Sequence, residues 1–218
     1  MQLNTVIFDM DGLLIDSEPL WYEASQEVLH RFGKQLTPKE YAVTMGLRTK
    51  ECVERWFIDF NLPFEHATAV ENDIEDLVIT KIKAKGKPMA GVAQAFNYFL
   101  GLQFKIGLAS SSAMRIIDVV VDKLAIRPYL NIITSAELLP YGKPHPQVYL
   151  DCAAALNSKP IECICFEDSF NGMIAAKAAK MKCVVVPSAQ ESQHLKFGAA
   201  DLRLSSLVNF NGLLLNSL

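Results

Sequence analysis

Near its N-terminus the chain reads Leu3-Asn4-Thr5-Val6-Ile7-Phe8-Asp9-Met10-Asp11-Gly12, an apolar run that ends in two acidic residues and a glycine. The run predicts a buried β-strand. Side chains two residues apart on an extended chain point the same way, so Asp9 and Asp11 can converge on one site. Gly12 lets the chain turn sharply. Asp and Gly are also ordinary turn residues, so this stretch alone leaves a plain turn open.

Short apolar runs alternate with helical patterns along most of the chain. The runs predict strands at 6–8, 104–109, 130–133, 161–166 and 183–186, with a small edge strand at 202–204. The helical patterns between them lie at about 91–101, 112–124, 146–156 and 170–180. Continuous apolar strands that alternate with helices are typical of an α/β fold, in which a parallel sheet is covered on both faces.

The stretch from about 16 to 86 interrupts this alternation. It contains no convincing strand, and helical patterns fill most of it, at 21–32, 52–60 and 65–85. We therefore predict a Rossmann-like parallel sheet core, formed by residues 1–15 and 87–218, with an all-helical cap domain, residues 16–86, inserted after the first strand.

Composition limits the class of protein. Of the 218 residues half are hydrophobic, which is enough for a sizeable core, and the net charge of −3 offers no basic field for nucleic acid. No apolar stretch reaches about 18 residues without a charge, and the N-terminal residues lack the pattern of a signal peptide. The five cysteines form no Cys-x-x-Cys motif. We expect a reduced, cytoplasmic, monomeric protein without membrane or nucleic-acid partners.

Polar residues follow each of the first four predicted strands. They are Asp9 and Asp11, then Ser110-Ser111-Ser112, then Gly142-Lys143-Pro144-His145-Pro146, and finally Glu167-Asp168-Ser169. Each group alone has a plainer interpretation: a turn, a serine N-cap, a surface loop, or an acidic helix start. A lone histidine between two prolines is more often structural, so His145 is not expected to act.

The joint occurrence of these groups is more informative than any one of them. Ligands of an open parallel sheet bind beyond the carboxyl ends of its strands, where all four groups are predicted to meet. Carboxylates suit a hard cation such as Mg²⁺, and a metal with a lysine can neutralise phosphate charge while a carboxylate attacks phosphorus. The pattern therefore indicates phosphoryl chemistry.

With these residues the chain resembles the haloacid dehalogenase superfamily of phosphatases. The matching motifs are Asp9-Met10-Asp11-Gly12, Ser110, Lys143 and Glu167-Asp168, and the resemblance covers essentially the whole chain. In Asp9–Trp21 and Lys143–Asp151 it is most similar to small bacterial phosphatases that act on 2-deoxyglucose 6-phosphate and hexitol phosphates. The resemblance implies a sugar or polyol phosphate as the substrate.

The resemblance also implies roles for single residues. Asp9 would be the nucleophile that forms an aspartyl-phosphate, and Asp11 the general acid and base. Mg²⁺ would be held by the Asp9 side chain, the Asp11 backbone carbonyl and the Asp168 side chain. Glu167 would either contact the metal or orient a water bound to it.

The remaining implied roles concern the substrate. Ser110, Ser111 and Lys143 would bind phosphate oxygens. Arg48 lies where relatives place a specificity loop, and it either binds the leaving group or is a solvated loop residue. Trp21 is either a cap wall that faces the sugar or a core residue.

Two other functions use a similar set of residues. Phosphoglucomutases share the scaffold, but such relatives usually carry a histidine near position 21, where this chain has Trp21. A receiver-like domain phosphorylated on aspartate for signalling is the alternative without catalysis. The long helical insert and Asp11 as a ready acid favour turnover instead.

Overall fold

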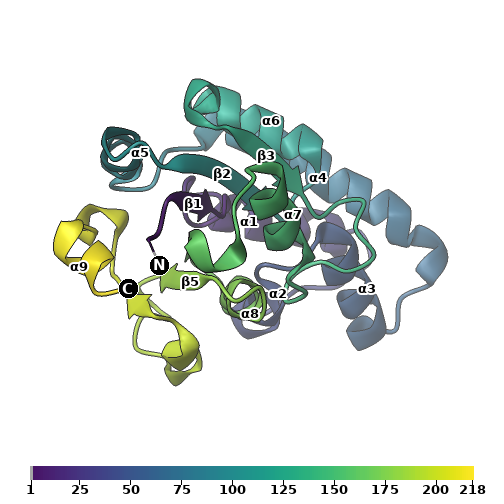
Figure 1. Ribbon diagram of the computed structural model, residues 1–218. Helices are drawn as coiled ribbons and strands as arrows, with labels where there is room; N and C mark the ends of the chain where they lie inside the picture. Colours follow the sequence, from purple (N-terminus) through teal and green to yellow (C-terminus); the bar gives the residue numbers. More distant parts are fainter. Residues whose placement is uncertain (1) are drawn as a thin grey trace.

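The computed structural model of the chain describes residues 2–218, and its centre is a parallel β-sheet (Figure 1). The strands are β1 (Thr5–Phe8), β2 (Lys105–Ser110), β3 (Ile132–Ser135), β4 (Cys163–Glu167), β5 (Lys182–Val185) and β6 (Leu202–Arg203). Their order in the sheet is β3-β2-β1-β4-β5-β6, and every pair is parallel. The α/β prediction is therefore confirmed, and β1 lies at the middle of the sheet.

Helices cover both faces of this sheet. They are α5 (Val92–Gly101), α6 (Met114–Lys123), α7 (Gln147–Ala155) and α8 (Phe170–Ala178), while the short α9 (Gly212–Asn216) lies near the C-terminus. Val6 and Phe8 face a core shared with α5 and α6, and Ile7 faces the opposite core, shared with α7 and α8. Alternate residues of a strand point to opposite faces, so the unbroken apolar run of β1 serves both cores.

Four α-helices follow β1 before the sheet resumes. They are α1 (Glu18–His30), α2 (Pro38–Thr44), α3 (Thr49–Phe60) and α4 (Ala67–Lys85), and no strand occurs among residues 18–85. The chain leaves and returns side by side, because the Asp16 amide donates to the Lys87 carbonyl at 2.9 Å and the Met89 amide donates to the Leu14 carbonyl at 3.0 Å.

The long helix α4 lies against α6 of the core (Figure 1). Arg115 of α6 pairs with the buried Glu75 of α4 at 2.9 Å, and Lys123 donates to the Lys83 carbonyl at 2.8 Å. The helical segment is therefore held to the core by polar contacts as well as by the paired connections at its base.

One predicted boundary bears on the site. Helix α6 begins at Met114 with Ala113 as its N-cap, two residues later than the sequence pattern predicts. The Ser112 amide donates to the Ser110 hydroxyl at 3.0 Å, so the backbone turns here before the helix begins. Ser110 consequently ends β2, and Ser111 and Ser112 lie in the loop between β2 and α6. Within residues 2–218, none of the helices combines the length and apolar character that a membrane crossing requires.

Candidate active site

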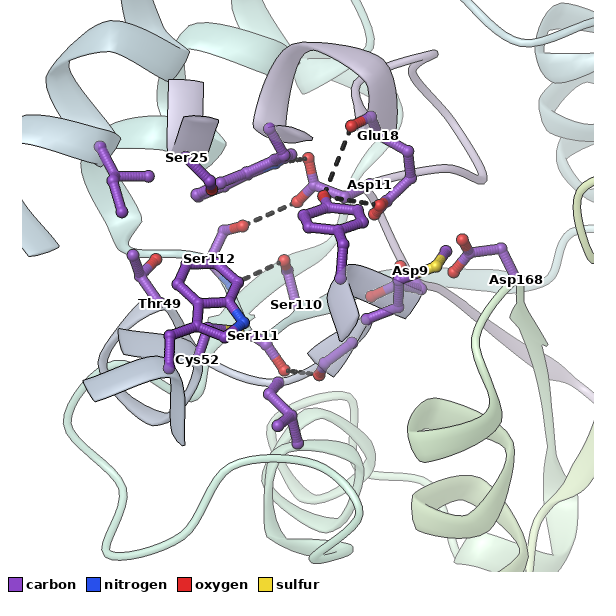
Figure 2. A pocket seen from close by; sticks show the side chains of 17 residues that line it. Asp9, Asp11, Glu18, Ser25, Thr49, Cys52, Ser110, Ser111, Ser112 and Asp168 are labelled. Carbon is purple, nitrogen blue, oxygen red and sulfur yellow. Dashed lines mark hydrogen bonds between the residues drawn. The ribbon is translucent and has the colours of Figure 1, made fainter. Parts of the chain in front are cut away.

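The central strands bring acidic and polar residues to one edge of the sheet. Phe8, the last residue of β1, is in register with Leu108 of β2 and Phe166 of β4, which lie close to the ends of their strands. Asp9 follows at once, and its amide donates to the Phe166 carbonyl at 3.0 Å. Ser110 ends β2 beside it, and Asp168 follows β4 (Figure 2).

Lys143 is buried at the centre of this edge, with 2% of its surface exposed. Its Nζ donates to Asp9 Oδ1 at 2.5 Å, to Glu167 Oε1 at 2.7 Å and to the Ala109 carbonyl at 3.1 Å. Burial alone would lower the pKa of Lys143, but the charges of Asp9 and Glu167 raise it above its usual range. The ammonium therefore stays charged beside Asp9 at neutral pH.

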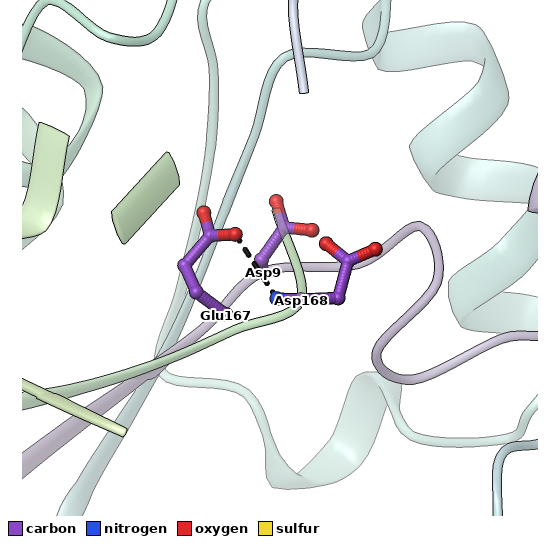
Figure 3. A group of neighbouring side chains, drawn as sticks. All are labelled: Asp9, Glu167 and Asp168. Carbon is purple, nitrogen blue, oxygen red and sulfur yellow. Dashed lines mark hydrogen bonds between the residues drawn. The ribbon is translucent and has the colours of Figure 1, made fainter. Parts of the chain in front are cut away.

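Three buried carboxylates surround that single ammonium. Asp9, Glu167 and Asp168 each offer an oxygen, and these oxygens lie within 4.8 Å of one another (Figure 3). Burial raises the pKa of Asp9, Glu167 and Asp11 add to the rise, and Lys143 opposes it. Burial also raises the pKa of Asp168, helped by Glu18, Asp9 and Glu167. One ammonium cannot balance three ionised carboxylates, so this donor set fits a hard divalent cation.

The three carboxylates of Asp9, Glu167 and Asp168 are not equally free to bind a cation. Both oxygens of Glu167 are occupied: Oε1 accepts from Lys143 and from Tyr149 at 2.5 Å, and Oε2 accepts from the amides and hydroxyl of the next two residues at 3.2–3.3 Å. Among residues 2–218, none donates a hydrogen bond to the Asp168 carboxylate. Gly12 makes room for it, because its φ is +70° and a Cβ there would lie 2.1 Å from Asp168 Oδ2.

Asp11 faces away from this cluster and is fixed by donors from both parts of the chain. Ser17 Oγ and Trp21 Nε1 donate to its Oδ1 at 2.6 and 2.9 Å, and Ser112 Oγ donates to its Oδ2 at 2.7 Å. Trp21 is thus a wall of the pocket and a hydrogen-bond donor at once. Ser112 belongs to the predicted serine group, although no single role was assigned to it, whereas Ser17 was not predicted as a site residue.

The other two serines of the loop have different surroundings. Ser110 lines the pocket and accepts from the Ser112 amide. Ser111 Oγ donates to the Gly46 carbonyl at 2.7 Å, which joins the helical segment to the core. Gly46 has φ +81°, and a Cβ there would lie 2.4 Å from Ser169 Oγ, so only glycine allows this close approach.

Arg48, predicted either to bind the leaving group or to be a solvated loop residue, does not belong to the pocket lining in this structure. Arg48 is the N-cap of α3, and its guanidinium turns away from the pocket lining to donate to the Leu139 carbonyl at 2.6 Å and to Glu51 at 2.7 Å. Glu51 in turn accepts from the Gly142 amide at 3.1 Å, next to Lys143. Arg48 and Glu51 therefore tie the helical segment to the loop that carries Lys143.

Two helices of the inserted segment line the pocket that also contains Asp9 and Asp11 (Figure 2). Side chains spaced three and then four residues apart share one face of a helix. Helix α1 contributes Glu18, Trp21 and Ser25, and helix α3 contributes Thr49, Cys52 and Trp56. Of these six, the sequence analysis identified Trp21 alone.

The pocket is small in this structure. Its volume of about 60 Å³ has room for a few water molecules. Sites for small organic ligands usually measure ~300–1,000 Å³. A ligand larger than a few waters therefore does not fit in this pocket as the side chains stand.

Comparisons with known proteins agree with this geometry. Residues 6–186 match the family described as haloacid dehalogenase-like hydrolase. The chain is 41% identical over 209 residues to hexitol phosphatase B of Escherichia coli strain K12, which covers 94% of this chain and 93% of that protein.

Solved structures share the fold. A β-phosphoglucomutase from Clostridium difficile superposes with a TM-score of 0.86 at 24% identity, covering 96% of this chain and 94% of that one. CbbY from Rhodobacter sphaeroides, solved in complex with phosphate, superposes with a TM-score of 0.87 at 22% identity over the full length of both chains. At these identities the likeness concerns the fold alone.

Proposed function

Because the chain belongs to the haloacid dehalogenase-like hydrolase family, we propose that it hydrolyses phosphate monoesters of small sugars or polyols, such as 2-deoxyglucose 6-phosphate and hexitol phosphates. The observation that carries this proposal is the buried Asp9, which is paired with Lys143 at 2.5 Å and lines a small pocket. The identity to hexitol phosphatase B supports the substrate class.

Asp9 is the proposed nucleophile. Its carboxylate oxygen bonds to phosphorus as the bond from phosphorus to the ester oxygen breaks, and Asp11 gives its proton to the departing alcohol. Water then attacks the aspartyl-phosphate, Asp11 takes a proton from that water, and phosphate leaves as Asp9 is regenerated. Lys143, held by Asp9 and Glu167, would stabilise charge on the phosphate together with Ser110 and Ser111.

Mg²⁺ is the proposed cofactor. Asp9 and Asp168 would bind it through their side chains and Asp11 through its backbone carbonyl. When bound, it would neutralise phosphate charge. Glu167 would act one step away, by fixing Lys143 and the backbone around Asp168, because its own oxygens are already occupied.

We further propose that residues 16–86 form a cap that opens and closes over the core formed by residues 1–15 and 87–218. The paired connections at Asp16 and Lys87 give the cap a natural hinge. The small volume of the pocket supports this proposal, because a sugar phosphate needs more room than the present arrangement offers.

A panel of hexose, pentose and hexitol phosphates tests the proposed function. We expect phosphate release from at least one member in Mg²⁺, loss of that release in EDTA, and recovery when Mg²⁺ is restored. Analysis of the products by NMR separates hydrolysis from transfer of phosphate within the sugar. Full activity in EDTA would reject the metal, and an isomerised sugar phosphate without free phosphate would favour a mutase.

Asp11→Asn is expected to separate the two proton transfers. A sugar alcohol is a poor leaving group that needs a proton, so phosphorylation of Asp9 by a sugar phosphate should slow by ~10²–10⁴-fold. An aryl phosphate leaves without that proton, but its phosphoenzyme still needs an activated water. Rapid quench should therefore trap phosphoenzyme from the aryl phosphate and little from the sugar. Equal phosphorylation rates from both substrates would remove Asp11 from the acid role.

Arg48→Ala distinguishes two possible roles of Arg48: binding the sugar leaving group, or holding the cap against the core. A residue that binds the leaving group would cause a selective loss on the sugar phosphate. The contacts of Arg48 to Leu139 and Glu51 lead us to expect instead that kcat/KM falls by a similar factor, about tenfold, on sugar and aryl phosphates, because closure is weakened for both. The ratio of the two kcat/KM values measures the difference, and Arg55→Ala on the exposed face of α3 is the matched control.

A further inference from the structure

Two polar atoms in the pocket wall lack partners within residues 2–218. They are the hydroxyl of Ser25, which is 0% exposed, and the indole nitrogen of Trp56, which is 3% exposed. Both residues line the pocket that contains Asp11, Ser25 from α1 and Trp56 from α3. Buried polar groups are nearly always hydrogen-bonded, and an unpaired one costs stability. Two such atoms facing one pocket point to a ligand that supplies the missing partners.

The chemistry of these atoms describes the ligand. An indole N–H can only donate, so it needs an acceptor oxygen, whereas a serine hydroxyl can donate or accept. Neither group is charged. Ser25 and Trp56 are therefore suited to bind an uncharged hydroxyl group of the substrate.

The rest of the wall supports a neutral leaving group. No lysine or arginine belongs to the pocket lining within residues 2–218, and Glu18 adds a carboxyl group there. Arg48 lies outside the lining, and its two terminal nitrogens already donate to the Leu139 carbonyl and to Glu51. A second phosphate under the closed cap would be buried without a counter-ion, which is strongly unfavourable.

The geometry of α1 indicates which part of the leaving group Ser25 can contact. Trp21 donates to Asp11, the proposed acid at the ester oxygen, and Ser25 lies four residues further along the same face of α1. Four residues of α-helix advance the chain by roughly 6 Å. Ser25 is therefore suited to groups beyond the carbon that carries the ester oxygen.

We propose that Ser25 and Trp56 recognise hydroxyl groups on a neutral leaving group, so that the enzyme selects polyol monophosphates over bisphosphates. The inference rests on the proposed function, since it describes the substrate of the same site. Ser25 and Trp56 would thus carry the selection, and a substrate with a second charged group would be disfavoured.

The test compares four substrates: a hexitol monophosphate, the corresponding hexitol bisphosphate, hexyl phosphate without hydroxyl groups, and a small aryl phosphate. Ser25→Ala and Trp56→Phe each remove one polar atom, and Ile74→Val alters the apolar wall without removing any. We expect each polar variant to lower kcat/KM for the hexitol monophosphate by about three- to tenfold. Hexyl and aryl phosphates should change by less than about twofold in the same variants.

Each outcome bears on one of the two proposals. Equal losses on all monophosphates, or no loss on the hexitol phosphate, would overturn the assignment of Ser25 and Trp56. If the wild type has the same kcat/KM for the hexitol bisphosphate as for the monophosphate, the proposed selection of a neutral leaving group is wrong. A wild-type enzyme that releases phosphate from none of the four would contradict the proposed function itself. Ser25→Ala removes a single oxygen, so it remains informative if Trp56→Phe fails to fold.

Discussion

Asp9→Asn is expected to lower the rate of phosphate release by at least about 10⁴-fold, because an amide cannot form the acyl-phosphate. The substitution keeps the shape of the side chain but removes the negative charge that pairs with Lys143 at 2.5 Å. It also removes one of the three carboxylates that could hold a metal ion. Binding of Mg²⁺ should therefore weaken together with turnover. Rapid quench followed by intact-mass measurement should show a phosphate adduct in the wild type and none in the variant.

A surface substitution of the same type provides the control. Asp59→Asn removes a carboxylate that pairs with Arg55 on the exposed face of α3, and it should change turnover by less than about twofold. Thermal unfolding of both variants separates a chemical effect from a folding defect. Near-wild-type turnover by a folded Asp9→Asn enzyme would end the covalent mechanism.

The sequence contained enough information to predict the sheet and the edge at which its polar residues meet. Parallel strands all end at the same edge, so residues far apart in sequence, such as Asp9 and Lys143, could be expected to converge without knowledge of any contact. Their contact at 2.5 Å follows from that rule. Strand boundaries were less certain, because strand pairing continues past the apolar runs: β2, β3 and β4 end at the polar residues Ser110, Ser135 and Glu167.

The contacts between the inserted helices and the core could not be predicted in the same way. A helical pattern shows which residues share a face, but it does not show how that face is rotated toward the core. The spacing of Trp21 and Ser25 is the same as that of Ala24 and Val28, which are core residues of the same helix. Arg48 illustrates the problem: its position in the loop was predicted, while its contact with the Leu139 carbonyl depends on the docking of two separate segments.

Lys143→Met should cause the largest loss of stability among the substitutions considered. The ammonium of Lys143 contacts Asp9 and Glu167, and both carboxylates are buried. Breaking a buried pair by removing one partner typically costs ~3–5 kcal/mol, because the remaining charge is left uncompensated. We expect the free energy of unfolding in EDTA to fall by about this amount at neutral pH. Turnover should fall as well, because a charge beside the phosphate is lost.

The pH dependence of this loss has a defined sign. The charge of Lys143 opposes the rise in the pKa of Asp9, so its removal raises that pKa further in the folded state. A carboxyl group with a raised folded-state pKa binds more protons when folded than when unfolded, and stability then falls as pH rises. The deficit of Lys143→Met relative to the wild type should therefore be largest at neutral pH and should shrink on acidification toward the pKa of an unfolded aspartate, about 4.

Urea unfolding of both proteins at about pH 7.5 and pH 5 measures this difference. Mg²⁺ should restore part of the lost stability at the higher pH, because a bound dication stabilises the folded state in proportion to its occupancy and balances the same carboxylates. Lys39→Met, at an exposed position of α2, is the matched control and should show no such pH dependence. A deficit that grows on acidification would show that Lys143 does not balance Asp9 and Glu167. In that case the loss would have to come from the packing of its side chain against Tyr149, whose ring centre lies 4.8 Å from Nζ.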